Sequence, residues 1–293
     1  MSSAAALIRT VRPQQWVKNL FVAAALVFSR HLLDPAYMGR TALAVLAFCA
    51  LSGAVYAFND VRDIVADRAH PTKRHRPIAS GALTERAALS WAAVLAGGAL
   101  AGCLALHWQL AAYAAAYLVQ SVLYSVRLKT VAFLDIALIA SGFLLRVLAG
   151  AAAIQVPVSP WLLICTPLLA LLLACGKRAH ELAWAEQTGR AGITRAALAG
   201  YDLRVLRAAM LGLAAITCAA YVAYTLDHRT VHSFGTDRLV YSAPFVVLGI
   251  LRFLVLALWR PTEDSPTEAM LKDPWFLLDL AAAAGTILYV IYT

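Results

Sequence analysis

Charged residues are scarce in this sequence. Asp, Glu, Lys and Arg make up 14% of its 293 residues, where about 25% is usual in soluble domains. Hydrophobic residues make up 62%, against roughly 45–50% in that class. This composition excludes an ordinary soluble protein and a disordered chain, because most side chains need an apolar surrounding.

Cysteine pairs and several common catalytic motifs are also missing. The five cysteines lie within apolar runs and form no Cys-x-x-Cys pair; they are Cys49, Cys103, Cys165, Cys175 and Cys218. We therefore interpret them as small buried hydrophobes, with neither a disulfide framework nor a zinc site. The sequence contains no Gly-x-Ser-x-Gly, His-Glu-x-x-His or P-loop motif, which leaves a serine hydrolase, a zincin and a Walker-type NTPase without support.

Long apolar runs are what the sequence has in abundance. They approach the roughly 20 residues that a helix needs to cross the hydrocarbon of a bilayer. The strands of a membrane barrel would be shorter and would alternate. We expect an all-α polytopic membrane protein, a single transmembrane domain over 1–293, with about nine helices around a cytoplasm-facing polar cavity. The expected spans are 17–34, 40–58, 87–106, 108–125, 131–153, 161–176, 205–226, 239–258 and 275–292.

Most of the 25 Lys and Arg residues fall on the predicted face that carries the N-terminus. By the positive-inside rule this face is cytoplasmic, and nine spans place the C-terminus on the other side. Topology thus explains the net charge of +9, and a nucleic-acid partner loses its main support. No cleavable signal is evident before the first span. We expect a multi-pass protein of the cytoplasmic (inner) membrane with its chemistry on the cytoplasmic side.

An acidic cluster follows the second expected span. On a continuing helix Asn59, Asp63 and Asp67 are spaced four residues apart, with Asp60 beside them, so their oxygens gather on one side. Three close carboxylates repel one another unless a cation lies among them, and hard oxygen ligands suit Mg²⁺ that bridges phosphate groups. The alternative is a solvated helix end, but the spacing and the adjoining basic run favour the metal site.

That basic run contains Lys73, Arg74 and Arg76. Guanidinium groups bind phosphate oxygens in pairs, so a polyphosphate ligand would suit it. The alternative is a positive-inside loop that contacts anionic lipid head groups. Beside the acidic cluster, the run favours a diphosphate ligand.

A second long cytoplasmic segment opens with Lys177, Arg178 and Glu181. Lys177 and Glu181 are four residues apart, which fits either a helix-surface ion pair or a second phosphate-binding group supported by Glu181. Further polar residues at span ends on the same face are open between lipid snorkelling and substrate binding. They are Lys18, Asn19, Tyr124 and Lys129.

Asp135 and Arg146 fall within or at the edge of the fifth expected span. Charge at this depth is costly and usually faces the bundle interior. The two residues are about three helical turns apart, so they point to the same side of the helix without pairing. This predicts a polar cavity with Asp135 near its mouth and Arg146 deeper. The alternative is a pair of structural, hydrogen-bonded charges.

The acidic and basic motifs together resemble the UbiA superfamily of intramembrane prenyltransferases. The matching residues are Asn59-Asp60-x-x-Asp63-x-x-x-Asp67 and Arg74-x-Arg76-Pro77-Ile78-x-x-Gly81, and the resemblance covers nearly the whole chain. Members hold a diphosphate through Mg²⁺ in two acidic motifs, after spans two and six. The resemblance implies that Asp60, Asp63 and Asp67 are catalytic metal ligands and that Asn59 is a neutral ligand. In place of the second acidic motif stands Gly176-Lys177-Arg178-x-x-Glu181.

The opening from Arg12 to Asn19 and the stretch from Asn59 to Ala79 are similar to one branch, the decaprenyl-phosphate phosphoribosyltransferases of arabinan (cell-wall) precursor synthesis. This resemblance implies Mg²⁺-dependent transfer of 5-phosphoribose from phosphoribosyl diphosphate to a polyprenyl phosphate, with release of diphosphate. The implied partners are these two substrates, the membrane and further copies of the chain, since this branch forms oligomers. The expected substrate-binding residues are Lys18, Asn19, Lys73, Arg74, Arg76, Tyr124, Lys129, Asp135, Arg146, Lys177, Arg178 and Glu181.

Two other functions are weighed against this one. A conventional prenyltransferase that moves an isoprenyl group to an aromatic acceptor would use the same first motif, but it should carry a second aspartate cluster. A transporter would place ionisable groups throughout the bilayer, whereas here they crowd one face. Both comparisons favour phosphoribosyl transfer.

Overall fold

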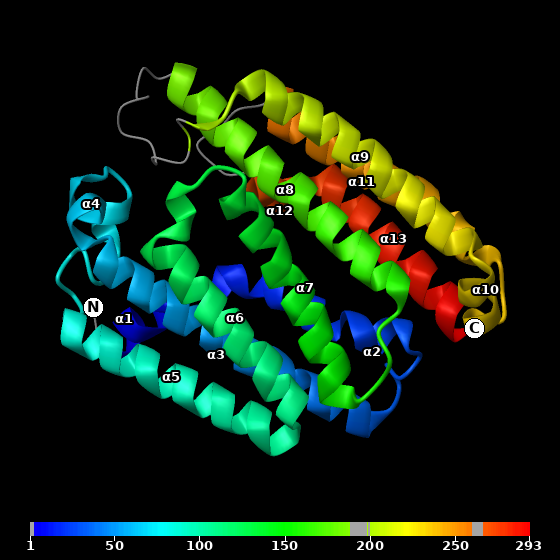
Figure 1. Cartoon of the computed structure of the whole chain (residues 1–293), viewed down its shortest axis with the longest axis horizontal. Coiled ribbons are helices and arrows are strands. Elements are labelled where there is room, and N and C mark those ends of the chain that lie inside the picture. The colour runs from blue at the N-terminus through cyan, green and yellow to red at the C-terminus, as the bar shows by residue number, and fades with distance from the viewer. Residues whose placement is uncertain (1–2, 188–197, 199, 260–265) are drawn as a thin grey trace. The chain divides into compact units, whose positions relative to one another are not determined.

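The computed structural model describes residues 3–187, 198, 200–259 and 266–293 (Figure 1). Over these residues all regular secondary structure is helical, either α or 3₁₀, which confirms the all-α class. Contacts divide the chain into two compact units. One comprises Met1–Val126 with Gly142–Val158, and the other comprises Arg127–Ser141 with Ser159–Thr293.

The first unit begins with short helices. They are followed by three long ones and by the second part of α7 (Leu134–Ile154). Its other elements are α1 (Ser3–Thr10), η1 (Pro13–Ala23), α2 (Ala24–Phe28), α3 (Pro35–Arg62), α4 (Ile64–Ala69), η2 (Lys73–His75), α5 (Glu85–Leu106) and α6 (Trp108–Val126).

The second unit contains the first part of α7 and a series of helices that continues to the end of the chain. They are η3 (Leu128–Thr130), α8 (Pro160–Gln187), α9 (Leu203–Leu226), α10 (His228–Phe234), η6 (Arg238–Ser242), α11 (Ala243–Trp259), α12 (Pro266–Lys272) and α13 (Pro274–Tyr292).

Among the described residues, seven helices are long and apolar enough to cross a membrane, so the chain is a multi-pass membrane protein and the expected count of nine is not confirmed. Two expected spans account for the difference. The segment 17–34 is not one helix but the 11-residue η1 followed by the 5-residue α2. The 19-residue α6 carries Gln109 and Gln120, which lower its hydropathy.

Acidic side chains and prolines start several of the long helices. Asp34 is the N-cap of α3 and accepts hydrogen bonds from the Ala36 and Tyr37 amides at 2.8 and 3.4 Å. Pro35 is the first residue of the helix. Asp202 caps α9 and Asp273 caps α13 in the same way. Each cap satisfies amides that the helix itself leaves without partners, worth about 1 kcal/mol.

Glycine permits a close approach of backbones in the first unit. The core there includes Val22 and Phe48, both fully buried. A Cβ atom at Gly150 of α7 would lie 1.8 Å from the carbonyl oxygen of Val22 in η1. Only glycine therefore fits at this crossing of α7 and η1.

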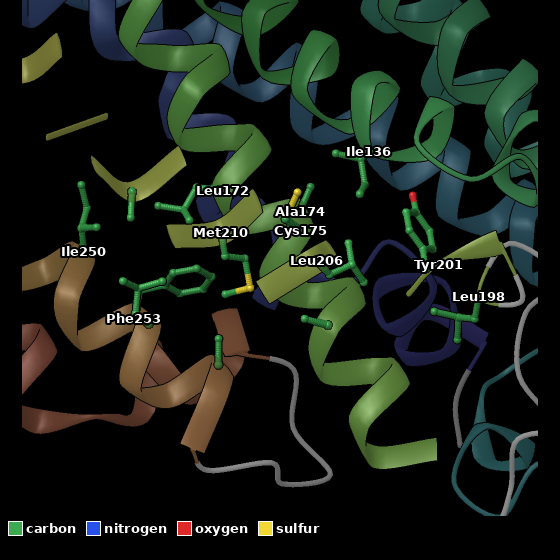
Figure 2. Packing of buried hydrophobic residues seen from close by; sticks show 14 residues of the cluster. Ile136, Leu172, Ala174, Cys175, Leu198, Tyr201, Leu206, Met210, Ile250 and Phe253 are labelled. Carbon is green, nitrogen blue, oxygen red and sulfur yellow. The ribbon is translucent and has the colours of Figure 1, made fainter. Parts of the chain in front are cut away.

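The core of the second unit gathers side chains from α7, α8, α9 and α11 (Figure 2). Leu172, Met210 and Phe253 lie at its centre and are at most 1% exposed. A Cβ atom at Gly176 would lie 2.4 Å from the Phe253 ring. The glycine of the second motif thus has a packing role in α8.

Candidate active site

The acidic cluster lies where α3 ends. The predicted continuous helix is wrong in detail, because α3 ends at Arg62 and α4 begins at Ile64, with Asp63 between them. The Asp63 amide still donates to Asn59 O at 2.9 Å, and the Asp67 amide donates to Asp63 O at 2.8 Å. The four-residue spacing of Asn59, Asp63 and Asp67 along the helix is therefore retained across the break.

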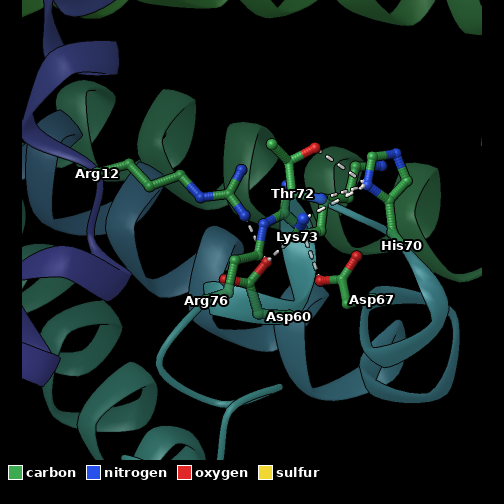
Figure 3. A network of polar contacts seen from close by, with 7 residues as sticks. All are labelled: Arg12, Asp60, Asp67, His70, Thr72, Lys73 and Arg76. Atoms are coloured by element: carbon green, nitrogen blue, oxygen red, sulfur yellow. Dashed lines mark hydrogen bonds and ion pairs between the residues drawn. The ribbon is translucent and has the colours of Figure 1, made fainter.

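Two of the carboxylates converge on one guanidinium group (Figure 3). Asp60 and Asp67 are buried, with 2% and 3% of their surface exposed. The Arg76 NH1 atom lies 3.2 Å from Asp60 Oδ1 and 2.7 Å from Asp67 Oδ2. Oxygens of both carboxylates thus face the same small volume. The proximity of Asp60 and Asp67, with Arg76 nearby, was expected from the sequence.

Hydrogen bonds order the basic loop that carries Arg76. His70 Nδ1 accepts from the amides of Thr72 and Lys73 at 3.3 and 3.4 Å, as Figure 3 shows. Arg68 Nε donates to Ala79 O at 3.1 Å. Lys73 is half-buried, whereas Arg74 is exposed and donates to its neighbour His75 at 3.3 Å.

Arg12 completes the cluster, and it was not among the expected site residues. Its NH2 group forms a short ion pair with Asp60 Oδ1, and its guanidinium lies 4.9 Å from the centre of the Tyr56 ring. Its backbone has φ 52° and ψ 68°, left-handed values just before Pro13, which cost of order 1–3 kcal/mol in a residue other than glycine. The only sequence signal for Arg12 was its place in the motif that ends at Asn19.

The donors at this cluster fit a magnesium ion. Within the described residues, no three His, Cys, Asp or Glu side chains are arranged to hold a metal. Mg²⁺, however, is usually bound by one or two carboxylates, with water and substrate phosphates as its other ligands. Asp60 and Asp67 supply two converging carboxylates. Asn59 adds a buried amide oxygen, Oδ1, that has no hydrogen-bond partner, an arrangement rare in folded proteins.

A separate polar network of the first unit surrounds Arg146, which is 7% exposed. Its Nε donates to Asn19 Oδ1, its NH1 to Gly142 O and its NH2 to the Tyr117 hydroxyl, each at 2.9 Å. Asn19 in turn donates to Ser52 Oγ at 3.2 Å. Each of the three nitrogens of Arg146 therefore has a partner within the protein, which favours the structural alternative. Tyr117 was not anticipated.

In the second unit, Asp135 and Arg178 form a buried ion pair, at 0% and 1% side-chain exposure. Arg178 Nε lies 2.6 Å from Asp135 Oδ2, and Arg178 NH1 lies 2.5 Å from Glu181 Oε2. The Tyr201 hydroxyl donates to Asp135 Oδ1 and accepts from the Phe133 amide at 2.7 Å. Tyr201 was not predicted. Burial and its bond to Asp135 raise the pKa of the Tyr201 phenol.

The other expected site residues are half-buried at separate places in the chain. Lys18 lies in η1, Tyr124 in the last turn of α6, Lys129 in η3 and Lys177 in α8. Trp16, beside Lys18, donates from its indole nitrogen to Val11 O at 3.3 Å. The roles expected for these residues stay predictions.

The profile of the UbiA prenyltransferase family matches residues 19–280. The chain belongs to this family. The decaprenyl-phosphate phosphoribosyltransferase of Mycolicibacterium smegmatis is 36% identical to it, over 98% of the chain and 92% of that protein. The enzyme of the same name from Corynebacterium glutamicum is 35% identical, over 91% of the chain and 81% of that protein.

A solved structure shares the fold. It is the UbiA homolog from Archaeoglobus fulgidus bound to DMAPP and Mg²⁺, with a TM-score of 0.72 and 16% identity, over 97% of this chain and 98% of that one. The resemblance that the motifs predicted is thereby confirmed at the level of family and fold.

Proposed function

We propose that this UbiA-family protein transfers 5-phosphoribose from phosphoribosyl diphosphate to a polyprenyl phosphate of the decaprenyl type and releases diphosphate. The observation that carries the proposal is the convergence of Asp60 and Asp67 on one cation position, which the Arg76 guanidinium occupies, with Arg12 paired to Asp60 beside it. Relatives that are named for this reaction match the chain over nearly its full length. The cluster, the basic loop and the relatives all favour a diphosphate donor.

The reaction breaks the bond between C1 of the ribose and the diphosphate oxygen. Positive charge then develops on the ribose ring and negative charge on the leaving diphosphate. A bound Mg²⁺, held by Asp60, Asp63, Asp67 and Asn59, would supply Lewis-acid stabilisation of that leaving group. Arg12 and Arg76, which contact the acidic cluster, and Lys73 of the basic loop would bind phosphate oxygens, since guanidinium and ammonium groups form charge-assisted hydrogen bonds with them.

The acceptor needs no dedicated general base. A phosphate monoester has its second ionisation near pKa 6, so the polyprenyl phosphate is an anion at neutral pH. One of its oxygens forms the new bond to C1 as the diphosphate departs. Within the second unit, Lys177 is the cation next to Arg178 in the chain, and we assign it to phosphate binding.

We place the reaction at the cytoplasmic face of the cytoplasmic membrane. The acidic cluster and the basic loop follow the C-terminal end of α3, and the segment after this end carries Arg68, Lys73, Arg74 and Arg76. Positive residues of this kind stay on the cytoplasmic side. The apolar spans supply the surroundings for an isoprenoid tail.

A donor-choice experiment tests the proposal. The purified full chain in detergent, with Mg²⁺ and polyprenyl phosphate, is given labelled phosphoribosyl diphosphate in one reaction and labelled prenyl diphosphate with an aromatic acceptor in another. Label should enter the lipid fraction from the sugar donor alone and should be lost with a chelator. Prenyl transfer to the aromatic acceptor, with an inert sugar donor, would show a conventional prenyltransferase instead.

A matched pair of variants ties the activity to the cluster. Asp67→Asn removes a charge that contacts Arg76, and it should lower transfer by at least about 100-fold, as loss of a charged group at the reacting centre does. Asp237→Asn makes the same change at an exposed residue of the second unit whose side chain caps no helix. It should leave transfer unchanged.

A further inference from the structure

Arg76 and Arg12 are held differently, although both contact Asp60. Arg12 contacts this one carboxylate and lies over the Tyr56 ring. Arg76 bridges two carboxylates through a single nitrogen, NH1. Its side chain is 28% exposed, so it has a route toward solvent.

A divalent cation and the Arg76 guanidinium compete for the same oxygens. Mg²⁺ binds carboxylate oxygens at about 2.0–2.1 Å. Arg76 NH1 lies 3.2 and 2.7 Å from the very oxygens of Asp60 and Asp67 that converge. A Mg²⁺ ion and the Arg76 guanidinium at these distances from the same carboxylate oxygens would lie close enough to repel each other strongly. Asp60 Oδ1 is already shared by Arg12 and Arg76, so a metal ion at these oxygens would add a third cation and would favour the departure of Arg76, which contacts both carboxylates.

The loop that carries Arg76 restricts how the conflict can be resolved. The Arg76 amide donates to Lys73 O at 2.9 Å, and Arg76 O accepts from the Ser80 amide at 2.9 Å. Pro77, which follows, is buried and fixes its own φ. The backbone is therefore held on both sides, and the side chain is the part that can rotate.

We propose that Arg76 is an exchangeable counter-ion. Its guanidinium neutralises Asp60 and Asp67 until a divalent cation arrives with a diphosphate, and it then moves from the carboxylates onto the phosphate oxygens. The guanidinium has planar paired donors that suit phosphate as well as carboxylate. This inference rests on the proposed function and adds a specific exchange between Arg76 and the metal.

The exchange predicts that removal of Arg76 changes two affinities in opposite directions, the affinity for the metal and the affinity for diphosphate. Without an anion, removal of Arg76 eliminates a competitor, so the metal should bind more tightly. In the presence of metal, removal of Arg76 eliminates a phosphate ligand, so diphosphate should bind more weakly. A residue that only ordered the carboxylates would weaken metal binding when removed. A residue that only bound phosphate would leave metal binding unchanged.

The test is metal binding itself. Full-length protein in detergent is titrated with Mn²⁺ as the probe, and free Mn²⁺ is followed by electron paramagnetic resonance. Arg76→Gln should bind Mn²⁺ about tenfold more tightly than the unaltered chain, because a like charge at contact distance is gone. Arg86→Gln, at an exposed arginine of the same unit, is the matched control and should bind as the unaltered chain does.

A second measurement follows labelled inorganic diphosphate at saturating Mn²⁺. Arg76→Gln should bind it at least several-fold more weakly, and Arg76→Lys, which keeps the charge, should recover part of the loss. Equal or weaker Mn²⁺ binding by Arg76→Gln, with an unchanged helical circular dichroism spectrum, would overturn the exchange. If the exchange is seen but phosphoribose is not transferred, the proposed function fails alone. If no variant binds Mn²⁺ at all, the exchange fails, and the donor-choice experiment decides the proposed function by itself.

Discussion

Arg146 in α7 donates from its Nε atom to the side-chain oxygen of Asn19 in η1 at 2.9 Å. This bond joins a buried cation to a 3₁₀ helix whose sequence was expected to form part of a straight span. Asn19 in turn donates a hydrogen bond to the hydroxyl of Ser52 in α3. A buried polar side chain in η1 thus has its partners on α3 and α7, which explains how an irregular helix is stable within an apolar unit.

Replacing Arg146 tests whether this network is structural. Arg146→Met should lower the free energy of unfolding by about 1–3 kcal/mol, because Asn19 Oδ1 and the Gly142 carbonyl lose a buried donor. Thermal unfolding in detergent measures the effect. Arg238→Met, at an exposed residue, should have little influence. Unchanged stability with a large loss of substrate affinity would instead make Arg146 a substrate ligand.

The Asp135–Arg178 pair should be costly to break. Removing one partner of a buried pair leaves an uncompensated charge, which destabilises by about 3–5 kcal/mol. We expect Arg178→Met and Asp135→Asn each to destabilise strongly, and the double variant to cost less than the sum of the two. A double-mutant cycle on unfolding measures this coupling. Additive effects would mean that the two side chains do not depend on each other.

Tyr201 gives a pH dependence with a definite sign. Because the pKa of its phenol is raised in the folded protein, the folded state keeps its proton longer than the unfolded state does. Its contribution to stability is therefore complete below the ordinary tyrosine pKa of about 10 and declines as the pH rises above it. The stability difference between the unaltered chain and Tyr201→Phe should be constant from pH 7 to about 9 and should shrink at higher pH. A difference that grows above pH 10 would contradict the proton-donor role of Tyr201.

Gly150 should tolerate no side chain. A Cβ atom there would meet the backbone of Val22, which has no rotamer to change, so Gly150→Ala should destabilise by about 3 kcal/mol or more. Gly97→Ala provides the comparison, since nothing lies within 4 Å of a Cβ atom at that position in α5. This change should be neutral or stabilise the helix by up to about 1 kcal/mol. Equal thermal stability of the two variants would argue against the close crossing of η1 and α7.

Contacts between residues that are close in the sequence could be predicted, whereas contacts between distant residues could not. Asp60, Asp67 and Arg76 lie within one short segment, and their local spacing was enough to bring them together in the prediction. Arg12 is 48 residues from Asp60, and Tyr201 is 66 residues from Asp135. No periodicity connects residues so far apart, and only the packing of the helices reveals them.

Burial changed the interpretation of the second motif. Charge alone gave Arg178 a phosphate-binding role, because the sequence does not show that Asp135 and Glu181 contact its guanidinium. The apolar pattern located the seven long helices, but α8 continues to Gln187, beyond the expected end at residue 176. It could not show that 17–34 is broken into η1 and α2, because the residues that pack against η1 and bond to it, Gly150 and Arg146, lie far away in the sequence.

The stoichiometry of the product tests phosphoribosyl transfer most directly. The purified chain with Mg²⁺, phosphoribosyl diphosphate and polyprenyl phosphate is sampled over time, with the lipid followed by mass spectrometry and the released diphosphate by enzymatic assay. We expect the lipid to gain the mass of one phosphoribosyl group for each diphosphate released, and we expect Asp67→Asn to stop both. Diphosphate release without a phosphoribosyl lipid, or full turnover by Asp67→Asn, would contradict this expectation.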